Sequence, residues 1–242
     1  SGTTTNGVNG PGTLLFTGTA SFGVLTPTGV LPNVVVGNGA SNNTVTVGVS
    51  TSLNNLNVNI GATISLGTRT LTINGFFTNN GVVTGTSGRL TTFTGASTNN
   101  GSINLTSGRI TLTTGSFTNN GSISMLTGRL IQTTGSIINS ATGTISFSGT
   151  GTITFGTGNF INLNSSTNVN FGTSPITISG TAVSQSIGGF TTTGTVSMTK
   201  ASGTVTFTGN VSGNNLTING TAGTLNLGAG LTHTFTGTWT RT

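Results

Sequence analysis

Four of the six basic residues in this chain recur at one fixed interval. Arg69, Arg89, Arg109 and Arg129 stand twenty residues apart, in a 242-residue sequence that contains no Asp and no Glu to pair with them. If the chain completes one coil every twenty residues, these arginines form a row along an outer edge, with about 4.8 Å between neighbours. Planar guanidinium groups suit carboxylate, sulfate or phosphate groups. The sequence thus predicts a candidate ligand-binding row for acidic polysaccharide or another anion.

The same row has an interpretation that needs no ligand. Like charges at this spacing in water repel each other by only roughly 0.9 kcal/mol before screening, so the row can exist without a partner. The arginines would then keep a neutral surface soluble and prevent sideways association of sheets. A third interpretation is contact with an acidic partner protein or a neighbouring module. The sequence leaves all three open.

The missing carboxylates exclude most catalytic chemistry. Glycoside hydrolysis by paired acids, an acid-assisted serine triad and carboxylate calcium sites all need Asp or Glu. His233 is the only histidine and there is no cysteine, so neither a histidine cluster nor a thiolate can bind a metal. We therefore expect no catalytic residue, no metal, no cofactor and no enzymatic activity.

Two single residues near the C-terminal end have alternative roles. His233 lies in LTHTFTGTW, a strand pattern, where it would be either a proton switch or, as we favour, a side chain on the solvent face of a strand. Trp239 in the same motif either stacks against a sugar ring or, as we favour, packs in the core or caps the end.

The net charge of +6 does not indicate nucleic-acid binding. Charged residues are 2% of the chain, Lys200 is the only lysine and there is no tyrosine, whereas nucleic-acid sites combine dense basic clusters with aromatic platforms. No run of 18 apolar residues is present, so we expect no membrane-spanning helix. We expect a segment of a longer chain, whose other modules would be its neighbours.

A twenty-residue repeat predicts the fold. The segments 78–97, 98–117 and 118–137 align without gaps, and the second reads TNNGSINLTSGRITLTTGSF. Within it, Ile103 and Leu105, then Ile110 and Leu112, alternate with polar residues, which is typical of strands. Gly and Asn-Gly pairs favour turns between them. We predict an all-β, right-handed parallel β-helix (β-solenoid) with three short strands in each coil of about 20 residues.

The repeat also predicts two ladders of stacked amides. Paired asparagines recur at the same place in each coil, and stacked coils bring identical side chains within hydrogen-bonding distance. These structural residues are Asn79, Asn80, Asn99, Asn100, Asn119 and Asn120.

The flanks are less regular than the centre. Residues 1–40 contain Pro11, Pro27 and Pro32 and predict an irregular start or linker, because proline cannot donate in a strand ladder. Residues 41–242 predict the solenoid, most regular over 69–138 and less regular over 139–242. The alternative after about residue 180 is a separate β-sandwich.

Thr-x-Thr steps raise the idea of an ice-binding face. Examples are Thr111–Thr113 and Thr204–Thr206, but these steps do not recur at one fixed position in every coil. We therefore do not favour this function.

Two motifs resemble a known group of surface proteins. NNLTINGTAGTLNLGAGLTHTFTGTW (214–239) and FTNNGSI (117–123) resemble the long repetitive proteins of Bacteroidota that the type IX secretion system exports, including the giant SprB-type adhesins of gliding motility. The resemblance covers residues 70–242. It implies an extracellular, cell-surface filament that contacts a substrate or polysaccharide, and it carries over no catalytic residues.

These observations together favour a structural role. We expect a segment of a large bacterial cell-surface adhesin or extracellular filament, providing a stiff rod for attachment or gliding. One alternative is a binding module for acidic polysaccharide through the arginine row. Another is a subunit of a self-assembling extracellular fibre, with neighbouring filament chains as partners.

Overall fold

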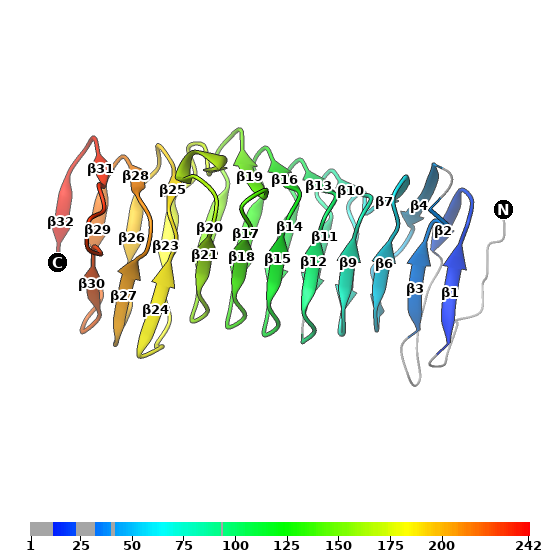
Figure 1. Ribbon diagram of the computed structural model, residues 1–242, viewed down its shortest axis with the longest axis horizontal. Helices are drawn as coiled ribbons and strands as arrows, with labels where there is room; N and C mark the ends of the chain where they lie inside the picture. Colours follow the sequence, from blue (N-terminus) through cyan, green and yellow to red (C-terminus); the bar gives the residue numbers. More distant parts are fainter. Residues whose placement is uncertain (1–11, 23–31, 40–41, 93) are drawn as a thin grey trace.

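The chain folds into an elongated stack of coils built from short parallel strands (Figure 1). A computed structural model describes residues 12–22, 32–39, 42–92 and 94–242. Each complete coil contributes one strand to each of three sheets, which run the length of the stack. The parallel β-solenoid predicted from the repeat is therefore confirmed. The described residues place eleven strands in the longest sheets, so this part of the stack is about 50 Å long at the usual strand spacing.

Within the described part of the chain, sheet A contains eleven strands. They are β1 (Thr13–Phe16), β3 (Asn33–Val36), β6 (Leu56–Val58), β9 (Phe77–Asn79), β12 (Ser97–Asn99), β15 (Phe117–Asn119), β18 (Ile137–Asn139), β21 (Phe160–Asn162), β24 (Ser184–Ile187), β27 (Thr204–Phe207) and β30 (Thr224–Asn226).

Sheet B also has eleven strands among the described residues. They are β2 (Ala20–Phe22), β4 (Asn43–Val47), β7 (Ala62–Ser65), β10 (Val82–Gly85), β13 (Ser102–Leu105), β16 (Ser122–Met125), β19 (Thr144–Phe147), β22 (Val169–Asn170), β25 (Phe190–Thr191), β28 (Val211–Gly213) and β31 (Thr234–Phe235).

Sheet C carries the candidate site, and the structure describes ten strands in it. They are β5 (Thr51–Leu53), β8 (Thr70–Ile73), β11 (Arg89–Thr92), β14 (Arg109–Leu112), β17 (Arg129–Gln132), β20 (Thr152–Phe155), β23 (Ile176–Ile178), β26 (Val196–Met198), β29 (Leu216–Ile218) and β32 (Trp239–Arg241).

The core is a narrow column enclosed by the three sheets. Alternate residues of each strand point inward, so that in β14 Ile110 and Leu112 are buried while Arg109 and Thr111 are not. Stacking places buried residues directly over one another, as in the run Leu90, Ile110, Leu130. One coil buries little apolar surface by itself, and the continuous column supplies the core that each coil lacks.

Coil length is constant in the centre and variable beyond it. Phe117 pairs with Ile137, twenty residues on, but Ile137 pairs with Phe160 and Phe160 with Ile187. The added residues lie in corners, one of which contains the 3₁₀ turn η1 (Ser166–Asn168) between β21 and β22. Insertions at corners leave the strand ladders continuous because the strands still stack in all three sheets.

The solenoid begins earlier than the sequence predicts and continues through the C-terminal strands as predicted. β1 and β2 already pair with β3 and β4, so the sheets begin inside the stretch for which an irregular start was expected. Residues 1–11 and 23–31, with Pro11 and Pro27, lie outside the described residues. Strands β24 to β32 continue the same three sheets, so the alternative of a β-sandwich after residue 180 is wrong for the described chain.

Among the residues that the structure describes, helical structure is limited to the short turn η1. Over the residues that the structure describes, no helix has the length and apolar character needed to cross a membrane.

Candidate anion-binding groove on sheet C

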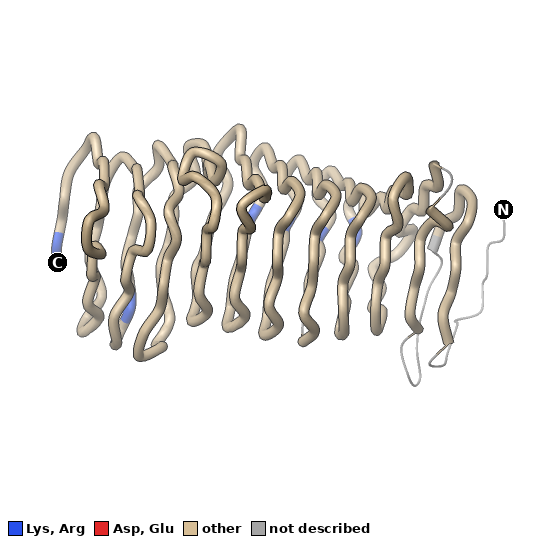
Figure 2. Tube along the Cα trace, viewed as in Figure 1, with Lys and Arg blue, Asp and Glu red and all other residues tan. Residues whose placement is uncertain are grey.

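Three of the four predicted arginines form a direct ladder. Arg89, Arg109 and Arg129 are the first residues of β11, β14 and β17, and each is the register partner of the next. The residue after each arginine is buried, so strand alternation turns the arginines outward. Figure 2 shows basic residues at only a few places along the rod and no acidic residue facing them.

Arg69 does not join this ladder, so the expectation of four rungs is wrong. Arg89 pairs with Thr70, and Leu90 pairs with Leu71. Arg69 is exposed in the preceding turn, where its N–H donates to the carbonyl of Leu66 at 2.8 Å. This coil is nineteen residues long between Leu71 and Leu90. Register follows the buried residues, because shifting them by one would turn them to solvent.

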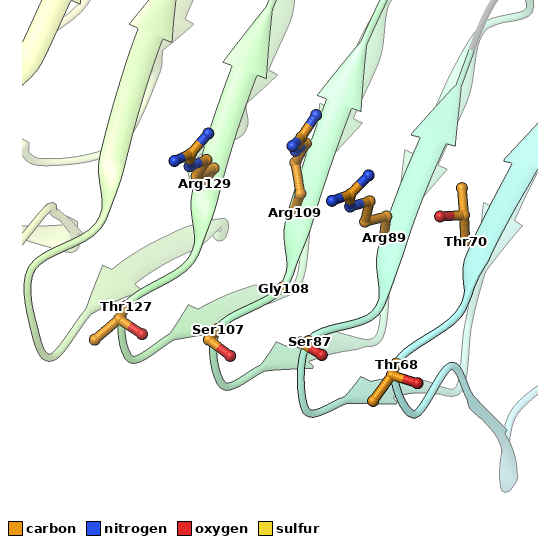
Figure 3. A pocket seen from close by; sticks show the side chains of 9 residues that line it. All are labelled: Thr68, Thr70, Ser87, Arg89, Ser107, Gly108, Arg109, Thr127 and Arg129. Atoms are coloured by element: carbon orange, nitrogen blue, oxygen red, sulfur yellow. The ribbon is translucent and has the colours of Figure 1, made fainter.

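The arginines line an open groove of about 500 Å³. Figure 3 shows the three guanidinium groups on successive strands, with hydroxyl side chains along the preceding turns. The lining residues are Thr68, Thr70, Ser87, Arg89, Ser107, Gly108, Arg109, Thr127 and Arg129. Ser87, Ser107 and Thr127 each stand two residues before an arginine. The sequence reasoning missed these hydroxyls, although the repeated Ser/Thr-Gly-Arg pattern could have indicated them.

The glycine before each arginine lets the turns stack closely. A Cβ atom on Gly108 would lie 2.3 Å from the carbonyl oxygen of Gly88 in the neighbouring coil. That same carbonyl accepts the backbone N–H of Arg109 at 3.0 Å, and Gly108 accepts from Arg129 at 2.9 Å. Each arginine backbone is thereby anchored to the coil before it, which holds the row in line.

Arg109 is the most enclosed member of the row. Its Nε is buried and has no hydrogen-bond partner among the described residues. Burial lowers the pKa of Arg109, and the charges of Arg89 and Arg129 lower it further. Arginine nonetheless remains charged in proteins. The central guanidinium is therefore a cation that lacks both a counter-charge and one hydrogen-bond acceptor.

The charged row has defined ends. Thr70 precedes Arg89 in the register and Thr152 follows Arg129, so three charges lie between two threonines. A second outward row runs beside it, and it is mostly hydroxyl. Its members are Ser52, Thr72, Thr91, Thr111, Ile131, Thr154, Thr177, Ser197, Thr217 and Thr240.

This second row modifies the sequence-based view of the threonines. Thr111 belongs to it, whereas Thr113 lies beyond the end of β14, and Thr204 and Thr206 are in sheet A. Hydroxyl residues thus recur at one position of sheet C in nearly every coil. A continuous Thr-x-Thr face still does not form, because arginines occupy the adjacent row in the central coils.

The buried asparagine ladder forms in the predicted register on sheet A. The Nδ2 of Asn79 donates to Oδ1 of Asn99 at 2.7 Å, and Asn99 donates to Asn119 at 2.8 Å. The chain continues through Asn139 and ends at Asn162. Nδ2 groups of this ladder also donate to backbone carbonyls, as Asn99 does to Ser122 at 3.1 Å. The ladder satisfies polar groups that would otherwise be buried alone.

The second asparagine ladder is on the surface and runs in the opposite direction. Asn100 donates to Asn80 and Asn120 donates to Asn100, each at 2.8 Å. The buried amides therefore point their donors towards the C-terminal coils, and the outer amides point theirs towards the N-terminal coils. Opposed amide dipoles at each corner partly cancel along the rod axis.

The structure places His233 differently from the sequence interpretation. His233 precedes β31 and is half-buried, not on the wet face of a strand. Its Nδ1 accepts the backbone N–H of Val211 at 3.1 Å, and its Nε2 lies 2.7 Å from the carbonyl oxygen of Leu227. Because Nδ1 accepts, Nε2 is the ring nitrogen that donates to this carbonyl. The ring ties neighbouring coils together.

Trp239 and Lys200 lie in environments that are unusual for their residue types, because the tryptophan is exposed and the lysine is buried. Trp239 is 55% exposed and makes an edge contact with Phe235, with ring centroids 5.4 Å apart. The core alternative for Trp239 is therefore wrong, and the residue lies in β32, at one end of sheet C. Lys200 is fully buried, and its Nζ donates to the carbonyl of Ala182 at 3.0 Å. Burial lowers the pKa of Lys200.

Comparisons with known proteins add no relative. No protein-family model, curated protein or solved structure matches this chain. Within the described residues, no group of three or more His, Cys, Asp or Glu side chains is placed to bind a metal ion.

Proposed function

We propose that this chain is a structural segment of a large bacterial cell-surface adhesin or extracellular filament, and that it acts as a stiff rod for attachment or gliding. One observation carries this proposal: the same three sheets continue through the described coils, from β1 to β32. Each coil contacts mainly its neighbours, so bending the rod requires breaking several ladders together. Such a design gives reach from repetition alone.

The surface and the sequence motifs support the same role. The outer faces carry mainly Thr, Ser and Asn, and the chain has no side-chain carboxylate, which favours a non-catalytic segment. The motif FTNNGSI corresponds to β15, the asparagine turn and the start of β16, so the resemblance to exported Bacteroidota surface repeats rests on residues that build the coil. Type IX secretion and an extracellular location are part of this proposal.

Rod length provides a direct test. Residues 98 and 118 are register partners, so additional copies of residues 98–117 can be inserted without changing the strand register. Four extra copies should lengthen the particle by about 19 Å at constant width, measured by small-angle scattering and electron microscopy. A particle that became wider, or that lost its parallel β-structure, would contradict the rod.

The location of the chain has its own test. Immunogold labelling of the source cells should place the chain outside the cell, and purely internal labelling would contradict the surface role.

The competing structural function is a self-assembling fibre subunit. That function predicts concentration-dependent growth of filaments from the isolated chain, measured by sedimentation velocity. A monodisperse rod across the concentration range would favour a segment that works within one long chain.

A further inference from the structure

We propose that the groove on sheet C binds a linear acidic polysaccharide that lies along the rod axis, with its anionic groups paired to Arg89, Arg109 and Arg129. The proposal goes beyond the rod function and does not depend on it, because a binding groove would operate on a short or a long solenoid.

The first support is the positive charge of three arginines that the fold holds in fixed positions without a counter-charge. Three guanidinium groups begin successive strands in direct register, and the chain contains no Asp or Glu to neutralise them. The central one, Arg109, has a buried Nε without a partner among the described residues. Burial and the two neighbouring charges lower its pKa, so a bound anion would relieve the repulsion and supply the missing acceptor.

The second support is the shape and lining of the groove. The groove extends over the turns that bear Thr68, Ser87, Ser107 and Thr127 and is about 500 Å³ in volume (Figure 3). Hydroxyl groups both donate and accept hydrogen bonds, which matches the hydroxyl groups of a sugar ring. Charged and hydroxyl rows that run parallel to the rod axis suit a polymer with repeated anionic groups better than a single compact anion.

The lining favours polysaccharide over other polyanions. Single-stranded nucleic acids bind through stacking on aromatic side chains, and no aromatic residue lines this groove in the described structure. A second copy of the chain has no acidic side chain to offer. An acidic polysaccharide needs neither an aromatic platform nor a protein carboxylate.

The length of the row predicts the length of the ligand. Thr70 and Thr152 replace arginine at the two ends, so the row offers three charges spaced about 4.8 Å apart. Affinity should therefore rise with oligosaccharide length until the ligand's anionic groups reach all three arginines, and then stop rising.

Calorimetric titration of the intact chain with oligogalacturonides of two to six residues tests this proposal. The variant Arg89→Gln/Arg129→Gln should weaken binding of the hexamer by about ten-fold or more, because it removes two charge-assisted contacts. The control Arg69→Gln/Arg241→Gln removes the same net charge outside the groove lining, and it should change affinity by less than about three-fold. A neutral xylo-oligosaccharide of equal length should bind at least about ten-fold more weakly than the uronate.

Three results would overturn the proposal. They are an equal loss of affinity in both double variants, an affinity independent of oligosaccharide length, or binding of a thymidine hexanucleotide as tight as that of the uronate. Far-ultraviolet circular dichroism checks the fold of each variant. If Arg89→Gln/Arg129→Gln does not fold, Arg89→Lys/Arg129→Lys replaces it. That variant retains charge but loses the forked geometry, and unchanged affinity in it would count against paired recognition.

Discussion

Two neighbouring stretches of the rod keep their coils in register by different means. In the regular coils, residues 77–139, every coil has the same length and a buried chain of asparagine amides links coil to coil. In the aromatic coils, residues 144–191, coil length varies and five phenylalanine rings fill the core. These rings belong to Phe147, Phe155, Phe160, Phe171 and Phe190.

The transition between the two stretches shows why they differ. Asn162 accepts from Asn139, but its own Nδ2 donates to the backbone carbonyl of Gly189 at 2.8 Å and not to another asparagine. The amide ladder thus ends where the coil lengthens. Aliphatic residues of similar size can exchange places in a core, so the regular coils need a polar ladder to specify register. In the aromatic coils the shapes of the packed rings specify the register. This packing is in the core, so it tolerates insertions at the corners.

The largest expected effect is loss of a central ring in the aromatic coils. Phe171 contacts the rings of Phe147, Phe155, Phe160 and Phe190. We expect Phe171→Ala to lower the free energy of unfolding by about 3–5 kcal/mol, because it removes apolar contacts and leaves a cavity.

Urea unfolding measures this change, and hydrogen exchange locates it. Exchange should accelerate in β19 to β25 before the regular coils. The matched pair is Phe171→Leu and Phe117→Leu. We expect less than about 1.5 kcal/mol for Phe117→Leu, in the regular coils, and a larger loss for Phe171→Leu, because the Phe171 ring contacts four other rings. Equal losses in the two variants would remove the distinction between the stretches.

The next effect compares two adjacent asparagines in one turn. Asn119→Ala should cost about 2–4 kcal/mol, since it leaves buried donors and acceptors of Asn99, Asn139 and Thr144 unpaired. Asn120→Ala removes only an exposed amide contact and should cost less than about 1 kcal/mol. Chemical denaturation measures the free energy of unfolding of both variants. A similar cost for each would show that turn geometry, and not the buried ladder, stabilises the regular coils.

A smaller effect depends on pH and belongs to the C-terminal coils. Burial lowers the pKa of Lys200, so between its folded-state pKa and about 10.4 the unfolded chain binds more protons than the folded chain. Stability should therefore rise as pH increases through that window. Lys200→Met should be more stable than the parent near neutral pH and should lack this rise.

Thermal melting from neutral to alkaline pH tests this prediction, with Arg241→Met as a control at an exposed basic residue. A fall in stability across the alkaline window would contradict a buried Lys200 whose charged form is disfavoured by burial.

The regular coils should respond little to acid. They contain no carboxylate, so their hydrogen-exchange protection should change little on acidification, when proteins with paired carboxylates lose stability.

The smallest effect concerns the arginine row itself. Arg109→Gln removes repulsion from two neighbours, and we expect it to stabilise the regular coils by at most about 1 kcal/mol at low ionic strength. The gain should vanish in about 1 M salt, where screening acts within a few ångströms. Melting temperatures at the two salt concentrations provide the measurement. A destabilised variant would mean that the guanidinium contributes to holding the coil together.

Much of the candidate site follows from the sequence, but one rung does not. The twenty-residue spacing predicts that Arg89, Arg109 and Arg129 stack, because identical residues of equal coils must coincide. The same spacing also selects Arg69, which the structure moves one residue out of line. Spacing counts residues along the chain, whereas register is set by which side chains are buried. The coil between Leu71 and Leu90 is one residue shorter, so equal spacing along the chain no longer means equal position in the register.

The roles of individual residues outside the repeat depend on contacts distant in sequence. For His233 and Trp239 the sequence favours a histidine on the solvent face of a strand and a tryptophan that packs in the core or caps the end. The hydrogen bonds of His233 come from Val211 and Leu227, and Trp239 lies exposed in β32, the last strand of sheet C. Neither environment is encoded by the few residues on each side.

The sequence by itself determined the solenoid, its period, the asparagine ladders and the absence of acidic side chains, because alternation and exact repetition leave only one way to bury the apolar residues. Only the tertiary structure decided where the arginine row ends and which residues replace the amide ladder in the aromatic coils. Those features depend on coil length and on packing between residues from different coils, and neither is visible until the coils are stacked.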